Sequence, residues 1–289
     1  MKFAFICAKT GQYPTAWLCR RLGVSTSGYY EWRQREPSKR QLRDDVLRLK
    51  IRAFFRRSCG RYGSPRIHDE LIADGERVSR KRVARLMREM GLYGRRRRRF
   101  RRTTDSNHRY GYAANLVNQD FTASGPDKLW LVDLSYIRTW DGWMYLAVVI
   151  DAFSRRVVGF AIDEHMRADL ARDALSMAIR QRSPAKGLIH HSDRGSQYCC
   201  GAYRQDLTHI GAIQSMSGVG NCYDNAVAES FFATIKEELI YRNVWPSKNG
   251  VAESVSKYIE GFYNPVRRHS TIGRISPIEY EARYRQQAA

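Results

Sequence analysis

Three acidic residues, Asp133, Asp193 and Glu229, stand where a carboxylate could do chemistry. Asp133 interrupts the apolar run LWLVDLSYI, and burying a carboxylate there is costly unless a cation or a donor compensates it. Asp193 follows the string LIHHS, at a strand end where loops gather at one edge of a sheet. An exposed strand face for Asp133 and a turn before Gly195 for Asp193 are the structural alternatives.

Glu229 is the best defined of the three acids, because the segment CYDNAVAESFFATIKEELI (222–240) has a helical pattern. At about 100° per residue, its apolar side chains share one arc, and Asn225, Glu229 and Lys236 fall together beside that arc. An acid and a base therefore face the same way at the rim of a buried face. Asp224 is better placed to cap the start of this helix.

Carboxylates that converge from a strand, a strand end and a helix can hold two divalent metal ions through oxygen ligands. Such ions activate a hydroxyl nucleophile and stabilise the leaving oxygen of a phosphodiester. Mg²⁺ suits this role, with Mn²⁺ as a substitute, because Mg²⁺ accepts few protein ligands and keeps places for water and phosphate. The expected catalytic and metal-binding residues are Asp133, Asp193 and Glu229.

The elements that must position these acids alternate between strands and helices. We expect strands over 128–138, 143–151, 156–162 and 186–192 and near 212–216, with helices over 168–182 and from about 224 to 240. In the first strand, Leu131, Asp133 and Ser135 share one face. Three strands in a row, followed by alternating helix and strand, predict an α/β fold with a mixed sheet flanked by helices.

The positive charge of the chain is concentrated before this region. The 289 residues include 50 Lys and Arg against 29 Asp and Glu, which gives +21 and a pI near 10.0. Residues 1–110 hold 30 basic and 10 acidic side chains, a net +20, whereas residues 111–289 hold 20 and 19, a net +1. A chain this basic usually meets a polyanion, so nucleic acid is the expected partner of its N-terminal part.

Residues 14–34 and 65–91 each predict two helices joined by a short turn that contains glycine. In the second pair, Ser79 is placed as an N-cap and Gly91 closes the helix. We interpret this all-α region as carrying a helix-turn-helix, with an ordinary helical hairpin as the alternative. The last helix carries the residues expected to contact DNA, which are Arg80, Lys81, Arg82, Arg85 and Arg88.

Residues 94–125 predict a linker, and seven of the eight residues 95–102 are arginine. Such a run binds phosphate without sequence specificity and with strong salt dependence. The DNA-binding residues expected here are Arg95, Arg96, Arg97, Arg98 and Arg99. The chain then divides into a basic helix-turn-helix region (1–93), this linker and a catalytic core with a C-terminal helical extension (126–289).

Other classes of protein fit less well. No apolar run approaches the ~20 residues that a membrane helix needs, and the six cysteines form neither a CxxC pair nor a zinc spacing. His190 and His191 are expected to pack or form hydrogen bonds rather than bind zinc. Asp151 is expected to be a turn residue. The residues expected to fold the C-terminal helix back toward the core, with contact to phosphate as the alternative, are Arg267, Arg268 and His269.

The surroundings of the three acids resemble a known family. Asp193 and Glu229 are separated by 35 residues, which matches the D,D-35-E arrangement of retroviral-integrase-type enzymes. The strings WLVDLSYI, VVIDAFSRRVVGF, HHSDRGSQY, GNCYDNAVAESFFATIKEEL and YNPVRRHSTIGRISPIEY resemble bacterial insertion-sequence transposases of the OrfB type. YPTAWLCRRLGVSTSGYYEW and RYGSPRIHDEL match that family's usual opening, so the resemblance runs from about residue 3 to about residue 284.

This resemblance implies a ribonuclease-H-like fold and a DDE-type polynucleotidyl transferase that cleaves DNA and transfers strands with two metal ions. Lys236, seven residues after Glu229, matches the family's basic residue that contacts the element end. The implied partners are double-stranded DNA, as terminal repeats and as target, and at least one further copy of the chain, because two element ends must be paired.

The expected location is the bacterial cytoplasm, on the nucleoid, without a membrane partner, and a fusion with the product of an upstream reading frame stays open. Two other functions are kept as alternatives. One is a DNA-binding regulator without catalysis. The other is a serine or tyrosine recombinase that forms a covalent bond to DNA.

Overall fold

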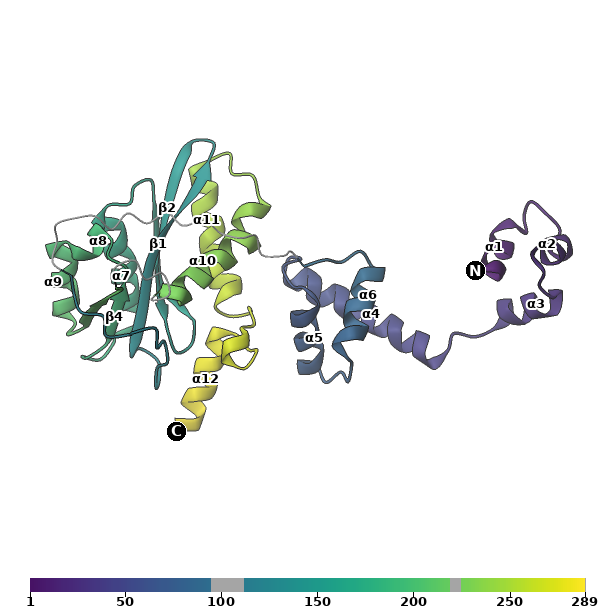
Figure 1. Ribbon diagram of the computed structural model, residues 1–289, viewed down its shortest axis with the longest axis horizontal. Helices are drawn as coiled ribbons and strands as arrows, with labels where there is room; N and C mark the ends of the chain where they lie inside the picture. The colour runs from purple at the N-terminus through teal and green to yellow at the C-terminus, as the bar shows by residue number, and fades with distance from the viewer. Residues whose placement is uncertain (95–111, 219–224, 289) are drawn as a thin grey trace.

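The structure is a computed structural model that describes residues 1–94, 112–218 and 225–288 (Figure 1). No helix of these described ranges is long and apolar enough to span a membrane. The arginine run expected to bind phosphate falls outside the described residues, as does Asp224. The residues of that run are Arg95, Arg96, Arg97, Arg98 and Arg99.

The chain begins with three short helices, α1 (Lys2–Lys9), α2 (Thr15–Leu22) and α3 (Thr26–Gln34), around a small apolar core that includes Ile6 and Tyr29. Gly23 ends α2 with a φ of 64°, a left-handed conformation that glycine adopts without steric cost. Ser25 caps α3, because its hydroxyl accepts a hydrogen bond of 3.0 Å from the Gly28 N–H. The helix pair expected over 14–34 is therefore confirmed.

The next three helices are α4 (Lys39–Arg57), α5 (Ser64–Ala73) and α6 (Arg80–Glu89). Ser79 caps α6, since its hydroxyl accepts a hydrogen bond of 3.3 Å from the Arg82 N–H. Gly75, with a φ of 82°, lies in the turn after α5, so the predicted pair of helices is present. α4 packs against both α5 and α6, and buries Leu47 and Ile51 in a core shared with them.

A mixed sheet forms the centre of the C-terminal part (Figure 1). Its five strands lie in the order β3-β2-β1-β4-β5, with β1, β2 and β3 antiparallel and with β4 and β5 parallel to β1. The bounds are β1 (Leu129–Thr139), β2 (Gly142–Asp151), β3 (Val157–Asp163), β4 (Ile189–Ser192) and β5 (Ile213–Met216). β1 is thus central, and the α/β prediction is confirmed.

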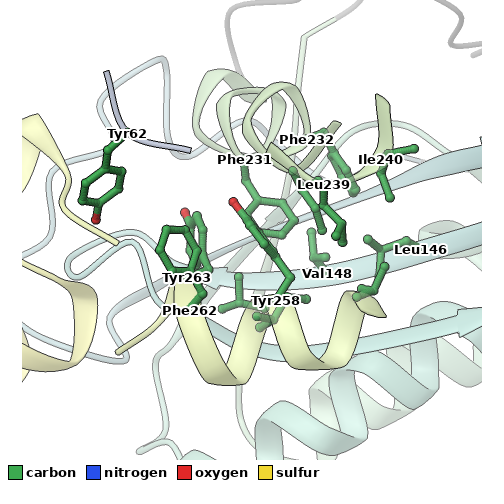
Figure 2. Packing of buried hydrophobic residues seen from close by; sticks show 14 of the residues in the cluster. Tyr62, Leu146, Val148, Phe231, Phe232, Leu239, Ile240, Tyr258, Phe262 and Tyr263 are labelled. Atoms are coloured by element: carbon green, nitrogen blue, oxygen red, sulfur yellow. The ribbon is translucent and has the colours of Figure 1, made fainter. Parts of the chain in front are cut away.

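Helices cover both faces of this sheet. One face, with Trp130 and Val132 of β1, packs against α7 (Ala168–Arg182), α8 (Ser196–Cys199) and α9 (Gly201–His209). The other face packs against α10 (Ala226–Glu238) and α11 (Lys248–Tyr258), which continues as a π-helical turn over Ile259–Tyr263. Figure 2 shows Phe231 of α10 and Tyr258 of α11 meeting above Leu146 and Val148 of β2. The apolar alternation of the strands therefore builds two cores, one on each face.

The C-terminal segment joins the sheet to the helical region. It contains 3-10 turns over Ile240–Arg242 and Ser270–Ile272 and ends in α12 (Pro277–Ala288). Arg267 binds Glu238 of α10 at 2.9 Å, as a role in folding this segment onto the core requires. Arg268 instead binds Glu70 of α5 at 2.7 Å, so this part of the expectation was wrong. The Arg268 side chain, which was expected to contact the core, instead forms an ion pair with the helical region.

Candidate active site

Asp133 lies on β1 beside the end of β4. The parallel register pairs Leu131 with His191, and the same register extended by two residues places Asp133 next to Asp193. Asp133 is half-buried, and its Oδ1 accepts a hydrogen bond of 2.8 Å from the Leu134 N–H. Burial and then the charge of Asp193 raise the pKa of Asp133 well above its usual value, and Glu229 adds to the effect. The three acids therefore share one electrostatic environment.

Asp193 follows β4 and begins the turn that leads into α8. Its Oδ1 accepts a hydrogen bond of 2.9 Å from the Gly195 N–H, so the structural role considered for it is real. The same carboxylate acts on the buried Tyr198, whose pKa is raised by burial and then by Asp193 and Asp133. One residue thus shapes a turn and contributes negative charge to the group of acids.

Glu229 lies in the first turn of α10 and is exposed. The helix that carries it crosses β1 and is tied to that strand at both ends. Near its start, Asn225 Nδ2 donates a hydrogen bond of 3.3 Å to the Val132 carbonyl, and near its end Lys236 Nζ donates one of 2.6 Å to Ser135 Oγ. Asn225 occupies the N-cap position of α10. The Asn225 side chain binds β1 and does not cap the helix.

Lys236 is buried under α10, at 5% exposure. Its Nζ lies 5.0 Å from the centre of the Tyr136 ring, and burial lowers the pKa of Lys236 to about 8 against the opposing pull of Asp133. The sequence pattern placed Lys236 on the Glu229 face, but it gave no reason to select Ser135 as its partner. The only signal was that Ser135 shares the strand face of Asp133.

The donor set fits a divalent cation in its chemistry. It consists of carboxylate oxygens, and Asp133 is disfavoured as an anion by its two acidic neighbours, a repulsion that a bound cation would relieve. Across residues 1–94, 112–218 and 225–288, no three His, Cys, Asp or Glu side chains are grouped closely enough to hold one ion. The three acids therefore interact electrostatically, but their side chains are not close enough together to coordinate one ion.

His190, His191 and Asp151 are buried and form hydrogen bonds within the fold. His190 and His191 are fully buried; His190 shares a hydrogen bond of 2.9 Å with the Tyr203 hydroxyl and His191 one of 2.8 Å with Ser215. Burial lowers the pKa of His190 to about 3, so this ring is neutral. Asp151 is fully buried and accepts hydrogen bonds from backbone N–H groups of its own turn and of the preceding loop. These positions match the packing and turn roles expected for them.

The basic residues of α6 fall into two groups. Arg82 and Arg85 each bind Asp44 of α4 at 2.7 Å, and so contribute to the helical core. Their contact with DNA would compete with these ion pairs. The remaining expected contact residues are exposed on the helix, namely Arg80, Lys81 and Arg88.

The fold and this group of acids define a class: an integrase-type core preceded by a helical DNA-binding region. Family models agree, since "Integrase core domain" models match residues 123–222 and 211–277 and an "HTH-like domain" model matches residues 41–100. The strand order and directions are those of the ribonuclease-H-like fold that the resemblance implied.

Curated relatives extend over nearly the whole chain. The "Insertion element IS600 uncharacterized 31 kDa protein" of Shigella sonnei is 44% identical over 272 residues, which cover 94% of this chain and 100% of the relative. "Transposase InsF for insertion sequence IS3A" of Escherichia coli (strain K12) is 42% identical over 284 residues, covering 97% and 98% of the two chains. The chain belongs to this family of insertion-sequence transposases.

Solved structures similar to this chain include retroviral integrase cores. The magnesium complex of the HTLV-2 integrase catalytic core domain, in its dimeric form, is 15% identical with a TM-score of 0.42, covering 55% of this chain and 98% of that one. The catalytic core domain of BIV integrase is 16% identical with a TM-score of 0.42, covering 56% and 98%.

Proposed function

We propose that this transposase is a metal-dependent polynucleotidyl transferase that binds the ends of its insertion sequence, cleaves a phosphodiester there and joins the end to target DNA. The observation that carries the proposal is the placement of Asp133, Asp193 and Glu229. Asp133 lies on β1, Asp193 follows β4 and Glu229 lies on α10. The charges of Asp193 and Glu229 both raise the pKa of Asp133. Family membership supports the same chemistry.

Asp133, Asp193 and Glu229 would hold the metal, proposed as two Mg²⁺ ions for which Mn²⁺ can substitute. When bound, these ions supply activation of the attacking hydroxyl and charge stabilisation at the leaving oxygen. Among the acids, Asp133 is half-buried on β1, whereas Glu229 is exposed on α10. Glu229 therefore has the most open approach for a DNA strand, and Asp133 sets the inner limit of the site.

Lys236 keeps α10 against β1 through Ser135, which fixes the position of Glu229 relative to Asp133. We also keep Lys236 as a proposed contact of the element end. Because its ammonium group is buried, such a contact needs a DNA atom to reach the seam between α10 and β1. Its lowered pKa leaves a proton that is more easily given up than that of an ordinary lysine.

Duplex DNA is the proposed partner in two roles, as terminal repeat and as target. Arg80, Lys81 and Arg88 present charge from the second helix of the helix-turn-helix, and Arg82 and Arg85 would add theirs if released from Asp44. The arginine run, Arg95, Arg96, Arg97, Arg98 and Arg99, remains a proposed nonspecific contact. Because two ends of the element must be paired, we propose that the protein acts as a homodimer or a larger assembly on DNA. The proposed location is the bacterial cytoplasm.

Strand cleavage by the purified full chain on labelled element-end DNA tests this proposal. Mg²⁺ should support nicking and joining, EDTA should abolish both, and the protein should not become covalently attached to DNA. A covalent adduct would instead indicate a serine or tyrosine recombinase. Tight binding of the element end without cleavage in Mg²⁺ or Mn²⁺ would indicate a regulator and would contradict the proposal.

A further inference from the structure

A basic groove lies between the helical region, α10 and the C-terminal segment. Its volume is about 270 Å³, far more than the roughly 30 Å³ that one water occupies in the liquid. Its walls include residues of α5, of the β2–β3 turn, of α10 and of the segment before α12, and among the residues that the structure describes no acidic side chain lines it. The charged and polar lining residues used below are Arg66, Arg155, Arg267, His269 and Ser270.

Positive charge exceeds negative charge around this groove. Glu238 binds Arg267 at 2.9 Å and lies 3.6 Å from Arg66, so one carboxylate serves two guanidinium groups. Within the described part of the chain, the Arg155 side chain forms no ion pair or hydrogen bond, and its Nε is shielded from solvent. Only the Nε of this half-buried guanidinium is shielded, and the Asp151 carboxylate acts on it through charge alone, so its other N–H donors remain available to an anion.

The charges also act on one another. Burial and then the neighbouring Arg267 lower the pKa of Arg66, and burial lowers the pKa of Arg155. The pKa of His269 falls to about 2 because the ring is buried and faces the three arginines, Arg267 first. His269 is therefore neutral, and the surplus charge in the groove belongs to the arginines.

Arg155 is also held in an uncommon backbone conformation. Its φ is 64°, in the left-handed region that residues other than glycine, asparagine and aspartate seldom adopt. This conformation belongs to the β2–β3 hairpin turn, in which the Arg155 N–H donates a hydrogen bond of 2.9 Å to the Asp151 carbonyl. The turn fixes the backbone from which the Arg155 side chain reaches the groove.

We infer that this groove binds a backbone phosphate of the DNA strand that runs past the three acids. The inference rests on the proposed function and deepens it. Guanidinium groups bind phosphate oxygens through paired N–H donors, and the Ser270 hydroxyl can donate as well. The α10 wall of the groove includes Val227 and Ser230, which flank Glu229 in the sequence, so a phosphate held here lies beside the first turn of the catalytic helix.

Arg155→Asn in the full chain tests this inference. Asparagine removes the charge and tolerates the left-handed backbone. Arg180→Asn is the matched control, because Arg180 is exposed on α7, which covers the opposite face of the sheet. Equilibrium binding to an element-end duplex is measured over a series of salt concentrations, and the melting temperature is measured for the free protein, with the duplex and with inorganic phosphate.

Loss of one phosphate contact should reduce the slope of log K against log salt by about 0.9 and weaken binding roughly tenfold. The melting temperature of free Arg155→Asn should stay near that of the wild type, because within the described part of the chain the Arg155 side chain forms no hydrogen bond or ion pair that the substitution would break. Arg180→Asn should bind like the wild type. Ser270→Asp, which places a negative charge in the groove, should weaken binding further and serves as a second, independent groove variant.

Three results would overturn the inference. The first is an unchanged salt slope for both groove variants while the wild type binds and cleaves its DNA end. The second is a marked fall in the melting temperature of free Arg155→Asn, which would show a structural role. The third is stabilisation by inorganic phosphate equal to that by duplex, which would assign the groove to free phosphate. A wild type that neither binds nor cleaves the DNA end would overturn the proposed function itself.

Discussion

Lys236 of α10 donates a hydrogen bond of 2.6 Å to the hydroxyl of Ser135, which lies two residues along β1 from Asp133. The Lys236 ammonium group and the Leu134 N–H lower the pKa of Asp133, whereas burial, Asp193 and Glu229 raise it. Position and charge are thus coupled at this contact. It holds α10 on the central strand and favours the ionised form of Asp133 on that strand.

Lys236→Met should therefore shift the pH dependence of cleavage. Without the ammonium charge the pKa of Asp133 rises further, and each unit of rise lowers the ionised fraction about tenfold at a pH below that pKa. We expect slower cleavage at neutral pH that is partly recovered at higher pH. Single-turnover rates in Mg²⁺ across a pH series measure this, and a profile with the wild-type shape would show that Lys236 does not act through Asp133.

The exposed basic residues of α6 should account for a measurable share of duplex binding. Replacing Arg80, Lys81 and Arg88 by Gln together should reduce the slope of log K against log salt by up to about 2.7, at about 0.9 for each phosphate contact. Arg283→Gln on α12 serves as the control. An unchanged slope in the triple variant would remove α6 from the DNA interface.

The ion pair between Glu70 and Arg268 should couple the helical region to the core. It has two contacts, of 2.7 and 3.1 Å, and both side chains are largely shielded from water. A double-mutant cycle with Glu70→Gln and Arg268→Gln should give a coupling energy of roughly 1–3 kcal/mol in urea unfolding. Strictly additive effects of the two substitutions would show that the pair does not connect these regions energetically.

His190 should make the fold sensitive to acid. Its pKa is about 3 in the folded chain against about 6.5 when unfolded, so the unfolded state binds more protons between these values. The stabilisation is complete above pH 6.5 and is lost as the pH falls toward 3. Between pH 7 and pH 5, His190→Gln should lose about 2 kcal/mol less stability than the wild type. Parallel losses in urea unfolding at the two pH values would contradict the assignment.

Local signals in the sequence were enough to predict much of the architecture. The cap at Ser79 marked the start of α6, because a hydroxyl that satisfies a free N–H is a short-range feature. Alternation placed Asp133 and Ser135 on one strand face, and the apolar context marked out Asp133. These features depend on residues a few positions apart, which a single sequence displays directly.

The parts that escaped prediction depend on contacts between distant residues. No helix was expected over α4, where Leu42, Val46 and Leu49 are exposed while Leu47 and Ile51 are buried, so no clean apolar stripe marks it. Arg268 pairs with Glu70 across 198 residues of sequence, and each of the two side chains could have paired with another residue of opposite charge. The surplus charge at Arg155 becomes visible only when its neighbours in space are known.

The central claim is that Asp133, Asp193 and Glu229 act as one metal-binding unit, and single-turnover cleavage by three charge-neutral variants tests it most directly. Asp133→Asn, Asp193→Asn and Glu229→Gln should each lower the rate by orders of magnitude, without further loss when combined, while duplex affinity stays near that of the wild type. Asp141→Asn, in the exposed β1–β2 turn, should cleave normally. Near-normal cleavage by folded Glu229→Gln would contradict the claim.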